Sequence, residues 1–126
     1  MSLGPVIFGL VIGMVAMSVV SSLLAQRAAR RFEGQPAPAL PGELGEAVRG
    51  DVILWFHAPS CGPCRAMKPS VEALGDRARI VDVSQDMGTA QAFGVMATPT
   101  TVVVRQGQVA AVRVGMLSPA ALAELA

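Results

Sequence analysis

The 126-residue chain is poor in charge, in aromatic rings, in cysteine and in histidine. Charged residues make up 15% of it, tyrosine is absent, and there are two cysteines and one histidine. Two cysteines are too few for a disulfide-stapled scaffold, and too few for a closed structural zinc site, which needs four ligands. A net charge of +1 without a basic stripe gives no reason to expect a nucleic-acid partner. A packed core must therefore rely on Val, Leu, Ile, Ala and Met.

The longest uncharged run lies at the N-terminus. Residues 1–26 contain no charged side chain, and most of residues 6–24 are apolar. A helix rises about 1.5 Å per residue, so about 20 such residues cross the hydrocarbon layer of a membrane. Arg27, Arg30 and Arg31 follow directly and end the run. We therefore predict a transmembrane anchor over residues 1–26.

A cleavable signal peptide is the alternative for this segment. It would place positive charge before the apolar run and a small-residue cleavage site after it. Here the positive charge follows the run, which favours an uncleaved, single-pass anchor. The positive-inside rule then predicts a cytoplasmic domain after the arginines, with an extracytoplasmic domain as the alternative. Gly9 and Gly13 have the spacing that brings some spans together, but glycine is common in membrane helices in general.

Residues 27–42 are predicted to be a basic segment that ends the membrane span, followed by a proline-rich linker. Pro36, Pro38 and Pro41 favour extended backbone. We expect this segment to be a semi-rigid spacer that holds the following domain, residues 43–126, off the membrane.

Helical and strand patterns alternate over residues 43–126. Strands are predicted for the apolar or β-branched runs 52–57, 79–83, 100–105 and 109–114. The last two flank Gly107 and should form a hairpin. Helices are predicted over 43–49, from Cys61 to about residue 74, over 88–93, and after Ser118, which caps the last one. This order predicts an α/β fold with a central mixed sheet of about four strands flanked by helices.

Cys61 and Cys64 lie where a buried strand gives way to a helix. At a helix N-terminus a thiolate meets unpaired backbone N–H groups and the positive end of the helix dipole, so Cys61 should be reactive. Cys64, nearly one turn later, should be better shielded and able to attack a mixed disulfide. Gly62 lets a partner chain approach closely, and Pro63 suits an early helical position. The alternatives are half of a zinc site or two unrelated core cysteines, and the chain has no second cysteine pair to complete such a site.

The run Cys61-Gly62-Pro63-Cys64 after a buried strand resembles the active site of the thioredoxin family. Residues 94–100 are similar to the segment that carries the family's cis-proline, and residues 107–109 and 114–115 to its hairpin turn and a glycine near the active site. The resemblance implies a minimal thioredoxin fold, a cis peptide bond before Pro99, and a substrate-binding surface that includes Thr98 and Gly115. It also implies a protein-disulfide reductase that works through the Cys61/Cys64 pair, with no metal or further cofactor. Its partners would be protein disulfides and, as electron donor, thioredoxin reductase or a membrane electron carrier.

The chain departs from the family's pattern around the cysteines. The family's buried aspartate is replaced by Trp55, and its accompanying lysine aligns with Ile80. It is physically reasonable that both charges are lost together, because either one alone would be buried without a partner, which is strongly destabilising. We hypothesise that His57 takes part of the aspartate's role as proton acceptor, since an imidazole exchanges protons at physiological pH; water is the alternative acceptor. Ser60 replaces the usual Trp before the first cysteine, and the family's first strand has no clear counterpart.

Other functions stay open on the sequence alone. An outward-facing domain would reduce the disulfides of exported proteins or serve cytochrome maturation. A Cu(I) chaperone could use the thiolates of Cys61 and Cys64 with the imidazole of His57. A tethered structural partner would carry the cysteine pair incidentally.

Overall fold

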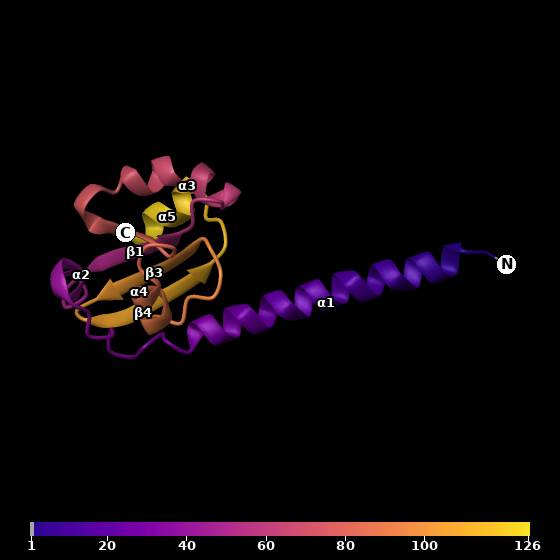
Figure 1. Cartoon of the computed structure of the whole chain (residues 1–126), viewed down its shortest axis with the longest axis horizontal. Coiled ribbons are helices and arrows are strands. Elements are labelled where there is room, and N and C mark those ends of the chain that lie inside the picture. The colour runs from indigo at the N-terminus through magenta and orange to yellow at the C-terminus, as the bar shows by residue number, and fades with distance from the viewer. Residues whose placement is uncertain (1) are drawn as a thin grey trace.

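The computed structural model of the chain describes residues 2–126 (Figure 1). Its four strands form one sheet in the order β2-β1-β3-β4. β1 is parallel to β2 and antiparallel to β3, which is antiparallel to β4. The strands are β1 (Val52–His57), β2 (Ala78–Asp82), β3 (Thr100–Arg105) and β4 (Gln108–Val114). The α-helices are α1 (Gly4–Arg30), α2 (Gly42–Ala47), α3 (Gly62–Glu72), α4 (Met87–Ala92) and α5 (Pro119–Leu125).

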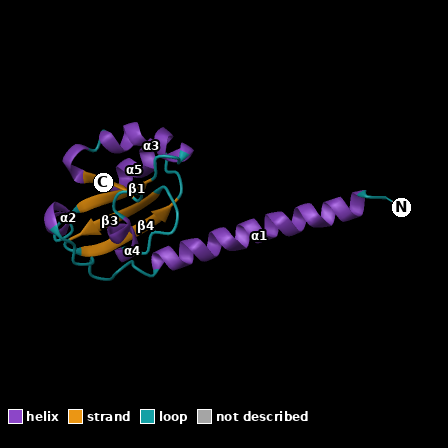
Figure 2. Cartoon of the chain, viewed as in Figure 1, coloured by secondary structure: helices purple, strands orange, loops and turns teal. Residues whose placement is uncertain are grey.

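Helices cover both faces of the sheet (Figure 2). On one face, Ile53 and Trp55 of β1 pack with residues of α3 and α5, among them Met67 and Leu122. On the other face, Leu54 and Phe56 pack with α4 and the segment after it. Successive side chains of a strand point to opposite faces, so the unbroken apolar run of β1 fills both cores. The predicted four-stranded mixed sheet flanked by helices is confirmed.

Most element boundaries lie within one or two residues of the prediction. The helix expected from Cys61 begins at Gly62, because Cys61 keeps an extended backbone as its N-cap. The β3–β4 turn places Gln106 and Gly107 at φ values of +52° and +75°, a conformation in which glycine is favoured. Ser118 caps α5 as predicted, its hydroxyl accepting a hydrogen bond from the Ala121 N–H at 3.1 Å.

Helix α1 is long and apolar enough to cross a membrane over Gly4–Ala28. Its large apolar side chains are exposed, including Phe8 and Leu24 at 68% and 58%. The helix continues to Arg30, past the predicted end of the anchor at residue 26. The exposed apolar surface is what the predicted anchor requires.

The segment after α1 lies against β4 and does not stand free as a spacer. Glu33 Oε1 accepts hydrogen bonds from the Val112 N–H at 3.0 Å and from Arg113 Nη1 at 3.1 Å. Backbone hydrogen bonds then run along β4, from Gly34 N to Val109 O (2.7 Å), Val109 N to Gln35 O (2.9 Å) and Ala37 N to Gly107 O (2.8 Å). The first part of the predicted linker is therefore attached to the sheet, where it satisfies backbone groups of an edge strand.

Candidate active site

The two cysteines are presented by the junction of β1 and α3. β1 ends at His57, and after three loop residues Cys61 stands at the N-cap of α3 with φ −83° and ψ 112°. Its sulfur accepts a hydrogen bond from the Cys64 N–H at 3.2 Å, one of the helix-end donors that has no partner within the helix. A disulfide joins Cys61 to Cys64, with their Cα atoms 5.2 Å apart.

The two sulfur-bearing residues differ in accessibility. Cys61 is half-buried, whereas Cys64 is only 2% exposed and packs with the α3/α5 core. Gly62 and Pro63 lie between them and are exposed. Cys61 is therefore the more accessible of the two cysteines.

Arg65 keeps a positive charge next to the loop that precedes the cysteines. Its guanidinium donates a hydrogen bond to the Pro59 carbonyl at 3.3 Å. The Cys61 N–H in turn donates to the Ala58 carbonyl at 3.1 Å, which closes the turn between β1 and α3.

Pro99 lies at the same end of the sheet as the cysteines. The Thr98–Pro99 peptide bond is cis, as the resemblance implied. Thr100, the next residue, pairs with Phe56 near the end of β1, and the Gly115 N–H donates to the Pro99 carbonyl at 2.8 Å. Pro99 is buried and Thr98 half-buried. The structure thus gathers Cys61, Cys64, Thr98, Pro99 and Gly115 around one end of the strands.

Trp55 is an apolar residue at the position where the resemblance places the family's buried aspartate. It is fully buried in the core that holds Cys64, and its partner across the parallel ladder is Ile80. The two positions where the family carries opposite charges are therefore neighbours here, both uncharged. Within residues 2–126, the Trp55 indole N–H and the Thr101 hydroxyl, on the facing residue of β3, are buried without hydrogen-bond partners. Local sequence pattern carried no signal for these two groups.

His57 is half-buried and stacks on Trp55, with the ring centroids 5.0 Å apart and the planes 4° from parallel. In the described part of the chain no hydrogen bond joins His57 to either cysteine. Its neighbour across the ladder is Asp82. Hydrogen bonds from Ser84 hold the pKa of Asp82 below its usual 3.8, and the nearby His57 lowers that pKa further. This carboxylate next to His57 was not anticipated from the sequence.

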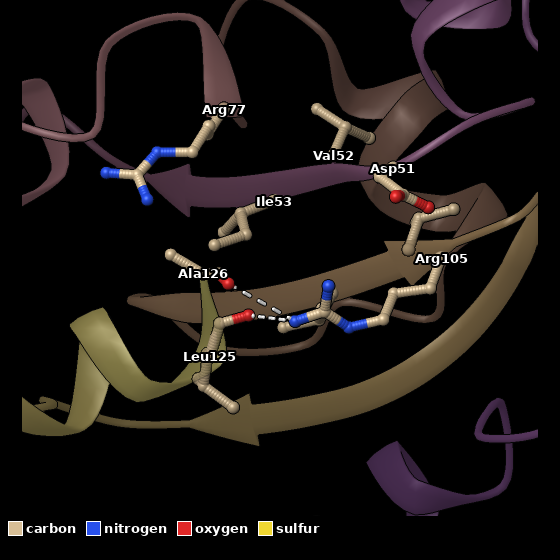
Figure 3. Close-up of a pocket in the computed structure, with 9 residues that line it drawn as sticks. Asp51, Val52, Ile53, Arg77, Arg105, Leu125 and Ala126 are labelled. Carbon is tan, nitrogen blue, oxygen red and sulfur yellow. Dashed lines mark hydrogen bonds between the residues drawn. The ribbon is translucent and has the colours of Figure 1, made fainter.

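Residues 2–126 contain no group of three or more His, Cys, Asp or Glu side chains arranged to hold a metal ion. His57, Cys61 and Cys64 do not form such a group while the two cysteines are joined in the disulfide. A cavity of about 280 Å³ lies at the far end of the sheet, lined by the start of β1 and the end of β3 (Figure 3). There Arg105 donates to the Leu125 carbonyl at 2.6 Å, so this cavity belongs to the attachment of α5 and is remote from the cysteines.

The fold and the site together define a thiol–disulfide oxidoreductase. A disulfide between a half-buried helix-capping cysteine and a fully buried one can exchange with other disulfides through a mixed-disulfide intermediate.

The thioredoxin family model matches residues 43–126. The thioredoxin of Bacillus subtilis (strain 168) is 41% identical over 86 residues, which are 64% of this chain and 83% of that protein. That of Streptomyces clavuligerus is 41% identical over 76 residues, 56% of this chain and 71% of that protein. The solved structure of Fasciola hepatica thioredoxin is 31% identical, with a TM-score of 0.57 over 64% of this chain and 82% of that one. The chain belongs to the thioredoxin family, whose members act on protein disulfides.

Proposed function

We propose that this chain is a membrane-anchored protein-disulfide reductase in which Cys61 is the attacking thiol and Cys64 the resolving thiol. The difference in accessibility between the two carries the proposal: Cys61 is half-buried at a helix N-cap, and Cys64 is 2% exposed. The hydrogen bond from the Cys64 N–H to the Cys61 sulfur supports the same assignment, because such donors stabilise a thiolate.

The reaction begins from the reduced pair. The Cys61 thiolate attacks one sulfur of a substrate disulfide, forming a mixed disulfide and releasing the other substrate sulfur as a thiolate, which takes up a proton. Cys64 then loses its proton and attacks the Cys61 sulfur. This releases the second substrate thiol and leaves the Cys61–Cys64 disulfide. Two electrons have passed to the substrate, and an external dithiol donor must return them.

Substrate binding is assigned to the backbone beside the pair. The peptide groups of Thr98 make no hydrogen bond within residues 2–126, so they are free to pair with an extended substrate strand. Gly115 holds the Pro99 carbonyl, and the exposed Gly62 and Pro63 leave room for a chain to approach Cys61. A partner role for His57 in moving the proton of Cys64 is part of the proposal.

Anchoring through α1 is supported by the 25-residue stretch Gly4–Ala28, which is exposed and on average apolar enough to cross a membrane. Arg27 and Arg30 in the last turn of α1, with Arg31 after it, favour a cytoplasmic domain by the positive-inside rule. Thioredoxin reductase would then supply the electrons. An extracytoplasmic domain would instead depend on a membrane electron carrier.

The test of the cysteine roles is a trapping experiment on the full chain in detergent. With a disulfide protein such as insulin, Cys64→Ser should accumulate a covalent adduct on a non-reducing gel, because the mixed disulfide cannot be resolved. Cys61→Ser should accumulate none. The reverse pattern would contradict the assignment.

Two further measurements address the membrane. Retention of the chain in the pellet after carbonate extraction tests the anchor. The side of the membrane on which the domain lies is tested by labelling the two native cysteines. Intact, mildly reduced cells are treated with a maleimide that cannot cross the membrane. Protection that is lost on lysis is expected, whereas labelling in intact cells would place the domain outside.

A further inference from the structure

Helix α1 leaves the domain at the same end of the sheet as the cysteines. The chain from Ala37 back to Glu33 follows β4 from Gly107 to Val112. Further back, Gln26 and Arg30 line a hollow together with Val114 and Leu117. α1 therefore continues past the C-terminal end of β4, and Figure 1 shows it extending in the direction of the β4 arrow. That end of β4 is the active-site end, because Val114 pairs with Thr100, the residue after Pro99.

The contact between α1 and the domain lies at the level where a membrane span would end. About 20 apolar residues ending at Leu24 cover the roughly 30 Å of a hydrocarbon layer, so the next turns of α1 lie at headgroup depth. Leu24, Ala25 and Ala28 line a cavity of about 340 Å³ whose other wall is the segment before Pro99 together with β4. The active-site end of the domain therefore lies level with the surface of the bilayer that α1 would cross.

The junction holds this orientation through side chains that directly follow α1. Phe32 packs against the α4-side core and touches the position of Gly94. The Glu33 carboxylate binds both the Val112 N–H and the Arg113 guanidinium. Because these contacts come within three residues of the helix end, the domain is fixed to α1 and cannot rotate freely about a flexible tether.

The surface presented toward the bilayer is uncharged and carries exposed methionines. We call residues 94–99 and 114–117 the redox rim; it contains no acidic or basic residue. Met96 is 92% exposed and Met116 60%. Flexible, apolar methionine side chains suit an irregular apolar environment. Arginines at the end of α1 and after it supply the positive charge that anionic lipid headgroups attract.

We propose that the redox rim faces the bilayer at headgroup depth, with Met96 in contact with lipid. The substrates would accordingly be disulfides of membrane proteins that lie close to the membrane surface. This inference rests on the proposed anchoring of α1. A substrate disulfide on a soluble protein would have to enter the narrow space between the redox rim and the membrane. A disulfide on another membrane protein would reach the redox rim by lateral diffusion in the bilayer.

The test measures the depth of single labelled positions in the full chain carrying Cys61→Ser and Cys64→Ser. Met96→Cys, Arg49→Cys and Val15→Cys are each labelled with an environment-sensitive fluorophore and reconstituted into phosphatidylcholine–phosphatidylglycerol vesicles. Nitroxide-bearing lipids, with the nitroxide near the headgroup or deep in the acyl chain, serve as quenchers. Arg49 is the matched control: it is exposed like Met96 but precedes β1 at the opposite end of the sheet.

We expect the label at Met96 to lose fluorescence to the headgroup nitroxide and the label at Arg49 to lose none, while Val15 is quenched by the deep nitroxide. Quenching at Val15 with none at Met96 would overturn the inference and leave the proposed anchor intact. Absence of quenching at Val15 would refute the anchor, and the inference with it. A flexible Gly-Ser insertion between Arg31 and Phe32 should remove the Met96 signal alone; a signal unchanged by that insertion would contradict the fixed orientation.

Discussion

Gly94→Ala is predicted to separate α1 from the domain by displacing one aromatic ring. Gly94 has φ +65°, and a Cβ atom built on it would overlap the Phe32 ring, 2.8 Å from Cζ and closer still to Cε2. Phe32 is half-buried and is one of the two side chains that hold the domain against the end of α1. The substitution must therefore both strain the backbone and move the ring.

The cost of Gly94→Ala has two parts, the strain of the backbone and the lost burial of the Phe32 ring, and each can be estimated. An alanine in the left-handed region costs about 1–2 kcal/mol. Losing the burial of a half-buried phenylalanine costs about 1 kcal/mol more, half of what a fully buried ring contributes. Gly94→Ala should therefore lower the free energy of unfolding by about 2–3 kcal/mol. Gly75→Ala is the matched control, because Gly75 has a similar φ of +59° and a Cβ there would meet nothing within 4 Å. It should cost the backbone contribution only.

The assay is urea unfolding of the full chain in detergent, followed by the fluorescence of Trp55, the single tryptophan. The decisive comparison is a double-mutant cycle with Phe32→Ala. Without the ring there is nothing to displace, so Gly94→Ala should cost about 1 kcal/mol less in the Phe32→Ala background. Additive costs, within about 0.5 kcal/mol, would refute the proposed contact.

Three further predictions concern the strands that lead to the cysteines. His57→Phe keeps a ring stacked on Trp55 but removes the titrating nitrogens, so the rate of disulfide exchange at neutral pH should fall on the order of tenfold without a change in unfolding free energy; an unchanged rate would leave water as the proton acceptor. Trp55→Phe should change the unfolding free energy, measured by circular dichroism, by only about 1 kcal/mol, because the lost volume is offset by removal of an unpaired indole N–H. Trp55→Ala should cost about 3–5 kcal/mol, and equal losses in the two variants would contradict this account. Asp82→Asn should destabilise the domain at pH 7, and the difference should shrink as the pH falls below 3.8, because a lowered pKa gives stability that is present only while the carboxylate is ionised. If urea titrations gave the same difference in unfolding free energy at every pH, the stabilising role of the ionised Asp82 carboxylate would be contradicted.

Local pattern was sufficient for the strands, the hairpin and the cysteine helix. The run 52–57 is apolar at every position up to His57, so burial on both faces could be inferred without knowledge of its neighbours. The cis bond before Pro99 could not be inferred from local pattern, because most prolines that begin a strand are trans; it followed from the resemblance to thioredoxins.

The junction between α1 and the sheet could not be anticipated. Glu33 and Val112 are 79 residues apart in the sequence, and nothing near Glu33 indicates a distant partner. Prolines at 36, 38 and 41 are typical of an extended spacer, and extended backbone is equally able to pair with a sheet edge. The same applies to Asp82, whose carboxylate accepts hydrogen bonds from Ser84 across a turn that has no strong sequence signal.

The order β2-β1-β3-β4 leaves β2 at the outside of the sheet, with backbone donors and acceptors along one side. An open strand of this kind is a site where proteins adhere to copies of themselves and begin to aggregate. Here the strand is five residues long and carries Arg79, whose guanidinium lies 3.3 Å from a carboxylate oxygen of Glu43. The short length of β2 and the positive charge of Arg79 both oppose the addition of another strand. Replacing Arg79 by an apolar residue would therefore threaten solubility before it threatened the disulfide chemistry.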